Sequence, residues 1–398
     1  MNHVIKMTCL TENYPDGQKI YGVCLSYDKP IAPDLSLADA YQVENRTVCG
    51  VSVQGCDVIL SLDLKDVASA VILQPDSMPE GKKHLKKDGE EQPEAEKKPR
   101  KPHDTIPASK VVRVLQTADI TAADGTVIAP DGQWGASTEV DEPLICRFQQ
   151  KQYQGVNYNL YLPEGYDPAL RYPLVVFIHD AGVRGQDPRI TLMQGNGALT
   201  WAKPEWQAKH PCIVVAPQVS QNSDKEIDTV KGLIDSIRAA YSVDEKRIYA
   251  TGQSMGCMTF CEMNIQYPDY FTASLLVAGQ WDADRMAAAC TGCKFWILVS
   301  NHDERAFPGM NAVVDALEQK GVTFGRYYWD AKLPPQTLNR LAEQATHDAV
   351  DMRYTVFDGS SVVPAGKNDN PVTNHVCTWP VVYEIDGVKE WLFSCVKD

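Results

Sequence analysis

Residues 252–256 read Gly-Gln-Ser-Met-Gly and are preceded by a strand-like run, Arg-Ile-Tyr-Ala, at 247–250. Glycines on both sides of a serine let the chain turn sharply from a strand into a helix, which leaves the hydroxyl exposed on a strained turn. The serine then lies at the N-terminus of the helix, where backbone N–H groups can bind a developing oxyanion. The pattern predicts that Ser254 is a nucleophile and that the Met255 N–H is one oxyanion donor.

A serine hydroxyl needs a histidine to remove its proton and an acid to orient that histidine. After a serine turn of this kind, the acid follows at a later strand end and the histidine comes last. Asp303 fits the acid because it comes just after the strand-like run at 295–299, and its neighbour Glu304 is an alternative. Only His347 and His375 follow Asp303 in the sequence. We favour His375 as the base, because His347 lies in a polar stretch where a solvated histidine is common.

Residues 177–182 read Phe-Ile-His-Asp-Ala-Gly and fit a loop that follows an early strand. Such a loop supplies the second oxyanion donor in enzymes with this serine turn. The Ala181 N–H is the expected second donor. His179 is interpreted as a residue that orients the loop and takes no part in the chemistry.

The fold that must position these side chains is indicated by the second half of the chain. There, short apolar runs alternate with segments whose apolar residues recur with helical periodicity. Strands are expected at 156–162, 174–178, 212–217, 247–250, 273–278, 295–299 and 323–328, and helices at 223–241, 255–267 and 311–320. Continuous apolar runs are typical of buried parallel strands. The alternation predicts an α/β fold with a doubly wound, mostly parallel sheet. Residues 329–350 are interpreted as an insertion that covers the site as a partial lid.

The first part of the chain has a different pattern. Strand-like runs at 4–10, 20–27, 47–53 and 57–64 are separated by Asn, Asp, Pro and Gly turns, which predicts a small antiparallel sandwich. Residues 75–107 are rich in Lys, Glu and Asp and have almost nothing that could join a core, so we expect a solvated insertion. The strand pattern resumes at 110–115. We therefore divide the chain into domains at 1–135 and 136–398, with the insertion inside the first.

Composition limits the partners. The 52 acidic and 38 basic residues give a net charge of −14, which argues against nucleic acid or an anionic membrane. No apolar run approaches the roughly 20 residues that span a bilayer. The N-terminus lacks the basic-then-apolar pattern of a signal peptide. The chain is therefore expected to be cytoplasmic as written, or secreted or periplasmic if a leader was removed.

The 12 cysteines stand mostly singly in apolar runs, where a cysteine behaves as a small buried hydrophobe. Cys290 and Cys293 form the one close pair, and residues 290–293 are interpreted as a turn before a strand. A structural zinc would need two more ligands at a recognisable spacing. We expect no metal and no other cofactor.

An ordered set of segments resembles bacterial esterases that are often labelled peptidases, relatives of the polyhydroxybutyrate-depolymerase-like and feruloyl-esterase-like α/β-hydrolases. These segments lie at 158–163, 215–218, 247–256 and 375–393. Some relatives carry an N-terminal immunoglobulin-like domain, which fits the strand-rich first domain. The resemblance implies an α/β-hydrolase fold and a triad of Ser254, Asp303 and His375. The chain departs from the family at Cys257, where glycine is usual, and at Asp180, where His-Asp replaces His-Gly.

The favoured function is hydrolysis of a small-molecule or polymer-borne carboxylic ester through an acyl-enzyme. The alternatives are a serine peptidase with the same triad, a polyester depolymerase, a feruloyl or acetyl esterase on plant polysaccharide, and a binding protein with an inert hydrolase fold.

The first domain has no residue for the triad, so we expect it to pack on the hydrolase, shape the cleft entrance or mediate homo-oligomerisation. Five tryptophans are candidates for lining the cleft or for the core: Trp201, Trp206, Trp281, Trp329 and Trp379.

Overall fold

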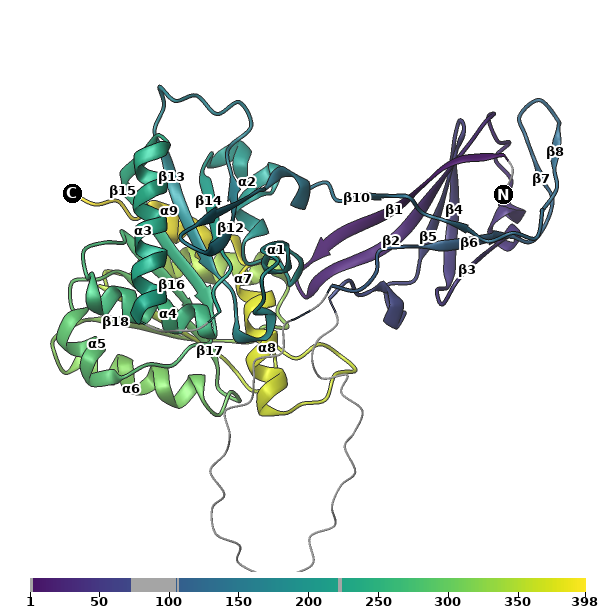
Figure 1. The fold of residues 1–398 in the computed structure, drawn as a ribbon. Helices are drawn as coiled ribbons and strands as arrows, with labels where there is room; N and C mark the ends of the chain where they lie inside the picture. Colours follow the sequence, from purple (N-terminus) through teal and green to yellow (C-terminus); the bar gives the residue numbers. More distant parts are fainter. Residues whose placement is uncertain (1–2, 73–104, 106, 221–223) are drawn as a thin grey trace, which may run out of the picture.

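The computed structural model of the chain describes residues 3–72, 105, 107–220 and 224–398. In this part, a β-rich lobe carries the N-terminal residues, and a larger lobe of strands and helices carries the C-terminal residues (Figure 1). The predicted charged insertion at 75–107 lies outside the described residues, apart from Thr105 and Pro107.

The first lobe is built from a five-stranded sheet, a three-stranded sheet and a two-stranded sheet, which confirms the predicted immunoglobulin-like domain. The five-stranded sheet has the order β10-β1-β2-β5-β4, with bounds Glu139–Asp141, Val4–Tyr14, Gly17–Tyr27, Asp57–Leu62 and Val48–Gln54. The three-stranded sheet has the order β3-β6-β9, with bounds Tyr41–Val43, Arg113–Gln116 and Gly135–Ala136, and β7 (Ile120–Thr121) pairs with β8 (Val127–Ile128). Short 3-10 helices lie at Leu35–Ala40 (η1) and Val67–Ser69 (η2). The domain boundary after residue 135 stays a prediction, although β10 pairs with β1.

A nine-stranded sheet forms the second lobe, in the order β11-β12-β14-β13-β15-β16-β17-β19-β18. The bounds in this order are Gln149–Tyr153, Val156–Tyr161, Ile213–Pro217, Tyr172–Ile178, Val243–Gln253, Ala273–Val277, Phe295–Ser300, Met352–Phe357 and Phe324–Trp329. β12 is antiparallel to both of its neighbours, and all other pairs are parallel. The central strands are buried along their whole length, as a sheet covered on both faces requires. The predicted doubly wound α/β fold is confirmed.

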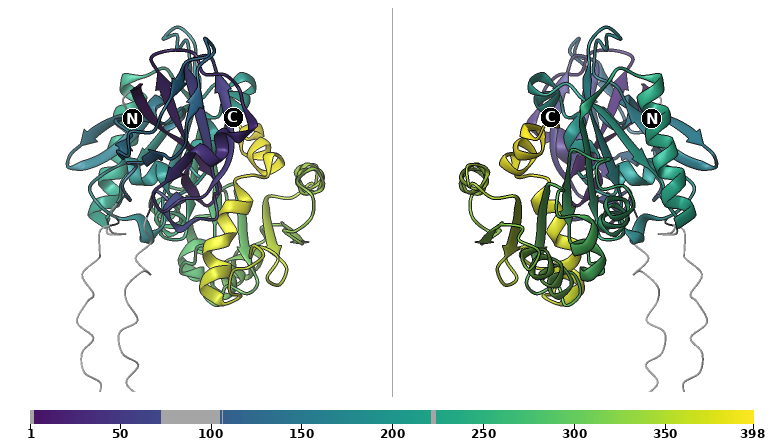
Figure 2. Two further views of the ribbon diagram at one scale, coloured as in Figure 1. Left: turned by 90° about the vertical axis from the view of Figure 1, so that its right-hand side faces the viewer. Right: turned by 90° about the vertical axis from the view of Figure 1, so that its left-hand side faces the viewer.

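Helices cover both faces of this sheet. In chain order they are α1 (Arg189–Met193), α2 (Pro204–Lys209), α3 (Asp224–Ala240), α4 (Met255–Gln266), α5 (Ala283–Ala289), α6 (Ala306–Glu318), α7 (Pro335–Thr346), α8 (Pro371–Val382) and α9 (Asp386–Ser394), with 3-10 helices η4 (Ile145–Arg147), η5 (Ala181–Val183) and η6 (Leu199–Ala202). Figure 2 shows α3 on one side of the sheet and α8 and α9 on the other.

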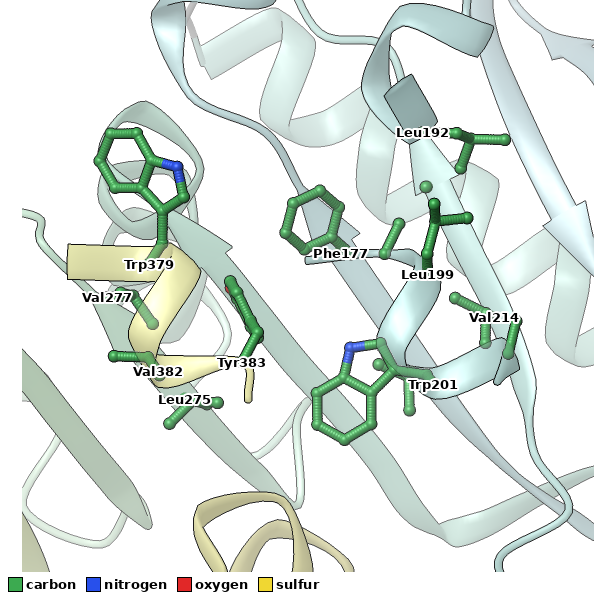
Figure 3. Packing of buried hydrophobic residues seen from close by; sticks show 14 of the residues in the cluster. Phe177, Leu192, Leu199, Trp201, Val214, Leu275, Val277, Trp379, Val382 and Tyr383 are labelled. Atoms are coloured by element: carbon green, nitrogen blue, oxygen red, sulfur yellow. The ribbon is translucent and has the colours of Figure 1, made fainter. Parts of the chain in front are cut away.

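Helix α8 is held firmly against the sheet. Its residue Val382 lies beside Leu275 and Val277 of β16 (Figure 3). The ring of Tyr383, which follows the helix, packs edge-on against Phe177 of β13 at 5.9 Å. This packing fixes the position of α8, which carries the predicted base His375.

The interpretation of residues 329–350 as an insertion is wrong. Strand β18 ends at Trp329, α7 follows, and β19 pairs with β18 in parallel, so this segment is an ordinary crossover helix between neighbouring strands. The start of the segment nevertheless reaches the site, as described below.

The predicted turn at 290–293 is present, with the Cys293 N–H donating to the Cys290 carbonyl at 3.1 Å, and both thiols are buried. Over the stretches of chain described above, no helix combines the length and apolar character that crossing a bilayer demands.

Candidate active site

Ser254 lies at the junction of β15 and α4, in the strained turn that the sequence predicts. β15 ends at Gln253, α4 begins at Met255, and Ser254 between them has a φ of 50° and a ψ of −110°. A non-glycine residue with positive φ is uncommon and costs conformational energy, and such strain is concentrated at functional sites. The Ser254 N–H donates to the Val277 carbonyl at 2.9 Å, which ties the turn to the neighbouring strand.

The flanking glycines allow this turn because no side chain fits at either position. A Cβ on Gly256 would lie 2.0 Å from the carbonyl oxygen of Ile178 on β13. A Cβ on Gly252 would lie 2.5 Å from the Gly256 carbonyl carbon. The helix that begins at Met255 can therefore approach the sheet closely enough to present Ser254 at the strand end.

We expect Gly256→Ala to lower both kcat and the free energy of unfolding, the latter by about 1–3 kcal/mol, because overpacking at this contact forces the turn to shift. Gly292→Ala is the matched control, since no atom lies within 4 Å of a Cβ at Gly292. Urea denaturation of both variants measures the effect. Equal stability of the two variants would contradict the close approach of α4 to β13.

The structure brings Ser254, His375 and Asp303 together. His375 Nε2 lies 2.8 Å from Ser254 Oγ, and His375 Nδ1 lies 2.5 Å from Asp303 Oδ2. An ionised carboxylate can only accept hydrogen bonds, so Nδ1 carries the hydrogen and Nε2 is free to accept the serine proton. The three side chains come from the end of β15, the loop after β17 and the helix α8.

Asp303 is positioned and kept ionised by its surroundings. Its Oδ1 accepts the backbone N–H groups of Arg305 (3.0 Å) and Ala306 (2.9 Å), and the residue is only 3% exposed. Burial alone would raise the pKa of Asp303, but the hydrogen bond and charge of His375, together with the two backbone donors, hold that pKa below its usual value. Asp303 can therefore orient His375 as an anion at neutral pH.

The two alternatives lie elsewhere. Glu304 is exposed, and its neighbour Asp303 makes the contact with His375. His347 is exposed at the C-terminal end of α7, and it is His375 that reaches Ser254. His375 lies in the second turn of α8.

Asn374 was missed by the sequence reasoning, although it holds α8 in register with the strand that carries the acid. Its side chain is fully buried; Oδ1 accepts from Ser300 Oγ at the end of β17 (3.2 Å), and Nδ2 donates to Asp369 Oδ1 (2.7 Å). The only available signal was its position next to His375. A buried amide with these partners fixes the separation of Asp303 and His375.

The loop after β13 is held by polar contacts on both sides. Asp180 caps η5: its Oδ1 accepts the Gly182 N–H at 2.7 Å, and its Oδ2 accepts Gln253 Nε2 at 2.9 Å. Asp180 therefore links this loop to the residue just before Ser254. Where the resemblance leads us to expect glycine, Asp180 supplies a side-chain carboxylate that caps the helix, and glycine has no side chain to do so.

His179 orients this loop from inside the core, as the sequence suggested. It is fully buried; its Nε2 accepts the Val219 N–H at 3.1 Å, and its Nδ1 donates to the Asp180 carbonyl at 2.7 Å. Burial lowers the pKa of His179, which keeps the ring neutral. Ala181, the expected second oxyanion donor, lies beyond these anchors and lines the same cavity as Ser254 and His375.

This cavity has a volume of about 940 Å³ and is lined by both lobes. Of the five tryptophans considered for a cleft, Trp379 is the one that lines it. The rings of Trp201, Trp206 and Trp329 are buried in the core, and Trp281 donates to Glu262. The Trp379 ring stands edge-on to His375, with centroids 5.2 Å apart.

The candidate site contains no visible metal-binding arrangement. Across residues 3–72, 105, 107–220 and 224–398, no three or more His, Cys, Asp and Glu side chains come together in a group that could hold a metal ion. The polar groups around Ser254 are those of proton transfer and oxyanion binding.

Comparison with known proteins relates both lobes to esterases. Residues 6–129 match the family described as esterase Ig-like N-terminal domain, and residues 156–325 match the family described as esterase PHB depolymerase. A solved structure described as a thermostable esterase aligns over 99% of this chain and 100% of its own, with a TM-score of 0.76 and 22% identity. That alignment confirms the fold of both lobes together.

Two curated relatives match parts of the hydrolase. "Probable feruloyl esterase C" of Aspergillus terreus is 29% identical over 107 residues, which are 26% of this chain and 38% of the relative. "Poly(3-hydroxyalkanoate) depolymerase C" of Paucimonas lemoignei is 28% identical over 129 residues, which are 27% of this chain and 31% of the relative. The chain thus spans about a third of the length of these relatives.

Proposed function

We propose that this chain, an α/β-hydrolase whose two domains match esterase families, hydrolyses carboxylic esters through an acyl-enzyme formed on Ser254. The observation that carries the proposal is the pair of hydrogen bonds that joins Ser254 to His375 (2.8 Å) and His375 to Asp303 (2.5 Å). Serine becomes a competent nucleophile when a neutral imidazole is oriented in this way.

The proposed reaction has two stages. Ser254 Oγ attacks the ester carbonyl while His375 Nε2 accepts its proton, and the resulting oxyanion binds to the N–H groups of Met255 and Ala181. His375 then gives the proton to the departing alcohol, which leaves the acyl group on Ser254. In the second stage His375 accepts a proton from water, the hydroxide attacks the acyl carbon, and the acid leaves as Ser254 regains its proton. Asp303 remains ionised and holds the Nδ1–H throughout.

The second candidate is a serine peptidase that uses the same three residues. It differs in its leaving group, because an amide nitrogen must be protonated before it departs. The esterase families matched by both domains favour the ester reaction. Feruloyl, acetyl and polyester substrates all satisfy the proposed chemistry, and self-association through the first domain remains a prediction.

The test compares p-nitrophenyl acetate and butyrate with peptide p-nitroanilides. We expect saturable turnover of the esters, and covalent labelling of Ser254 by a fluorophosphonate detected by mass spectrometry. Turnover of the anilides without the esters would replace the proposal with the peptidase. Failure of both reactions and of labelling would identify an inert hydrolase fold.

A further inference from the structure

The first domain reaches the cavity that contains Ser254. The hairpin of β1 and β2 extends to the hydrolase lobe near α1 (Figure 1). At its tip, Asn13 Nδ2 donates to the Leu192 carbonyl at 3.3 Å, and the Pro15 carbonyl would lie 2.7 Å from a Cβ on Gly195. The tip is therefore packed closely against the hydrolase, and Pro15 and Gly17 both line the cavity.

A second contact joins the first domain to the oxyanion loop. Thr105 is 4% exposed; its N–H donates to the Arg184 carbonyl at 3.2 Å, and its hydroxyl donates to the Gly182 carbonyl. The first domain is thus tied to the hydrolase at two places, at Leu192 and Gly195 and at Gly182 and Arg184.

The first domain contributes four aliphatic side chains to the cavity lining, beside the polar residues Asp16, Gln18, Lys19, Asp66 and Thr105. We call these four side chains the aliphatic wall and define it as Leu64, Val67, Ala70 and Ile72. Val67 is 90% exposed, so its side chain is accessible to a molecule that enters the cavity. Leu333 and Leu338, from the start of the β18–β19 crossover, belong to the same cavity.

The rest of the lining argues against aromatic or anionic substrates. Trp379 is the one Phe, Tyr or Trp among the described lining residues, and its ring already stands against His375. Four carboxylates and two lysines line the cavity. Asp16 is paired with Lys19 and Glu384 with Lys203, each at 3.1 Å, which leaves Asp66 and Asp180 against Lys367. An anionic ester would therefore meet net repulsion, whereas an uncharged chain would meet apolar surface.

We propose that the aliphatic wall of the first domain forms part of the substrate-binding site and selects uncharged esters with an extended aliphatic chain. This inference rests on the proposed ester hydrolysis at Ser254. A cavity of about 940 Å³ accommodates a chain well beyond an acetyl group. Each methylene buried against the wall raises kcat/KM by about fourfold, the factor that corresponds to the transfer of one methylene from water.

The experiment measures kcat/KM of the full chain for two ester series. One series varies the acyl group, from p-nitrophenyl acetate to octanoate; the other varies the alcohol, from ethyl to octyl acetate, followed by pH-stat. The variants are Val67→Asp and Ala70→Asp on the aliphatic wall. Val127→Asp is the matched control, because Val127 is an exposed valine (59%) on β8 of the same domain that does not line the cavity.

We expect wild type and Val127→Asp to favour the long esters, and both wall variants to lose about tenfold or more in the ratio of kcat/KM for the long ester to kcat/KM for acetate. A loss confined to one series identifies whether the acyl or the alcohol part lies along the wall, and either result supports the proposal. Identical chain-length profiles in Val67→Asp and Val127→Asp would overturn it, as would a preference for methyl ferulate over octanoate. Inactivity of the wild type toward every ester would instead refute the proposed function.

Discussion

Replacing Ser254 with alanine is expected to lower kcat for p-nitrophenyl butyrate by about 10⁴–10⁶-fold, because the variant lacks the hydroxyl that His375 activates. The fold should persist. The backbone bond from the Ser254 N–H to the Val277 carbonyl does not involve the side chain, and alanine meets the same positive φ as serine. Circular dichroism and thermal unfolding should therefore be almost unchanged.

Ser236→Ala is the matched control for this result. Ser236 lies on α3 and donates to the Leu233 carbonyl of its own helix, so its loss should leave kcat as in the wild type. Fluorophosphonate labelling should disappear in Ser254→Ala and remain in Ser236→Ala. More than a few per cent of wild-type activity in a clean preparation of Ser254→Ala would show that another group is the nucleophile.

The turn that carries Ser254 could be predicted from the sequence because the residues that form it are neighbours in the chain. The turn around Ser254 is recognisable because its glycines must leave room for the carbonyl of Ile178 and for the chain of α4. The order of acid and histidine follows from the topology of a parallel sheet, in which strand ends meet at one edge. That order reduced the candidates to His347 and His375, and the polar stretch around His347 favoured His375, which lies 121 residues from Ser254.

Strand β19 could not be predicted because polar residues interrupt its apolar pattern. Arg353 is 6% exposed, and its guanidinium donates to the carbonyls of Ala345 and Thr346 and lies against the rings of Trp296 and Trp391. These partners are distant in sequence or lie on another element, so nothing near Arg353 indicates that its charge is accommodated. The missing strand is the reason that α7 was mistaken for an insertion.

The contact between the two domains also could not be predicted from the sequence. Strands were predicted at 4–10 and 20–27, yet pairing continues to Tyr14 and Gly17. The residues of this extension are mostly polar, because the tip of the hairpin contacts the hydrolase and the cavity instead of the core of its own sandwich. Likewise, the bond from Gln253 to Asp180 joins residues 73 positions apart and leaves no local pattern. Side chains that position the site from another element are visible only in the fold.

His375→Ala should reduce kcat about as severely as Ser254→Ala, since a serine without its base is barely nucleophilic. The matched control is His347→Ala, which removes an exposed histidine at the end of α7 and should be nearly silent. If the two results were reversed, the base would be His347.

The pH dependence of the free energy of unfolding of His375→Ala should show how His375 influences the ionisation of Asp303. A carboxyl whose pKa is lowered by folding stabilises the protein above its unfolded pKa, and this contribution disappears as the pH falls through its folded pKa. In His375→Ala the buried Asp303 loses a hydrogen bond and charge that lower its pKa and keeps only its backbone donors. The variant should therefore unfold more easily than the wild type at about pH 7, and the difference should shrink toward about pH 3. Urea denaturation at both pH values measures it, with His347→Ala as the control. A difference that stays constant with pH would mean that His375 does not influence the ionisation of Asp303.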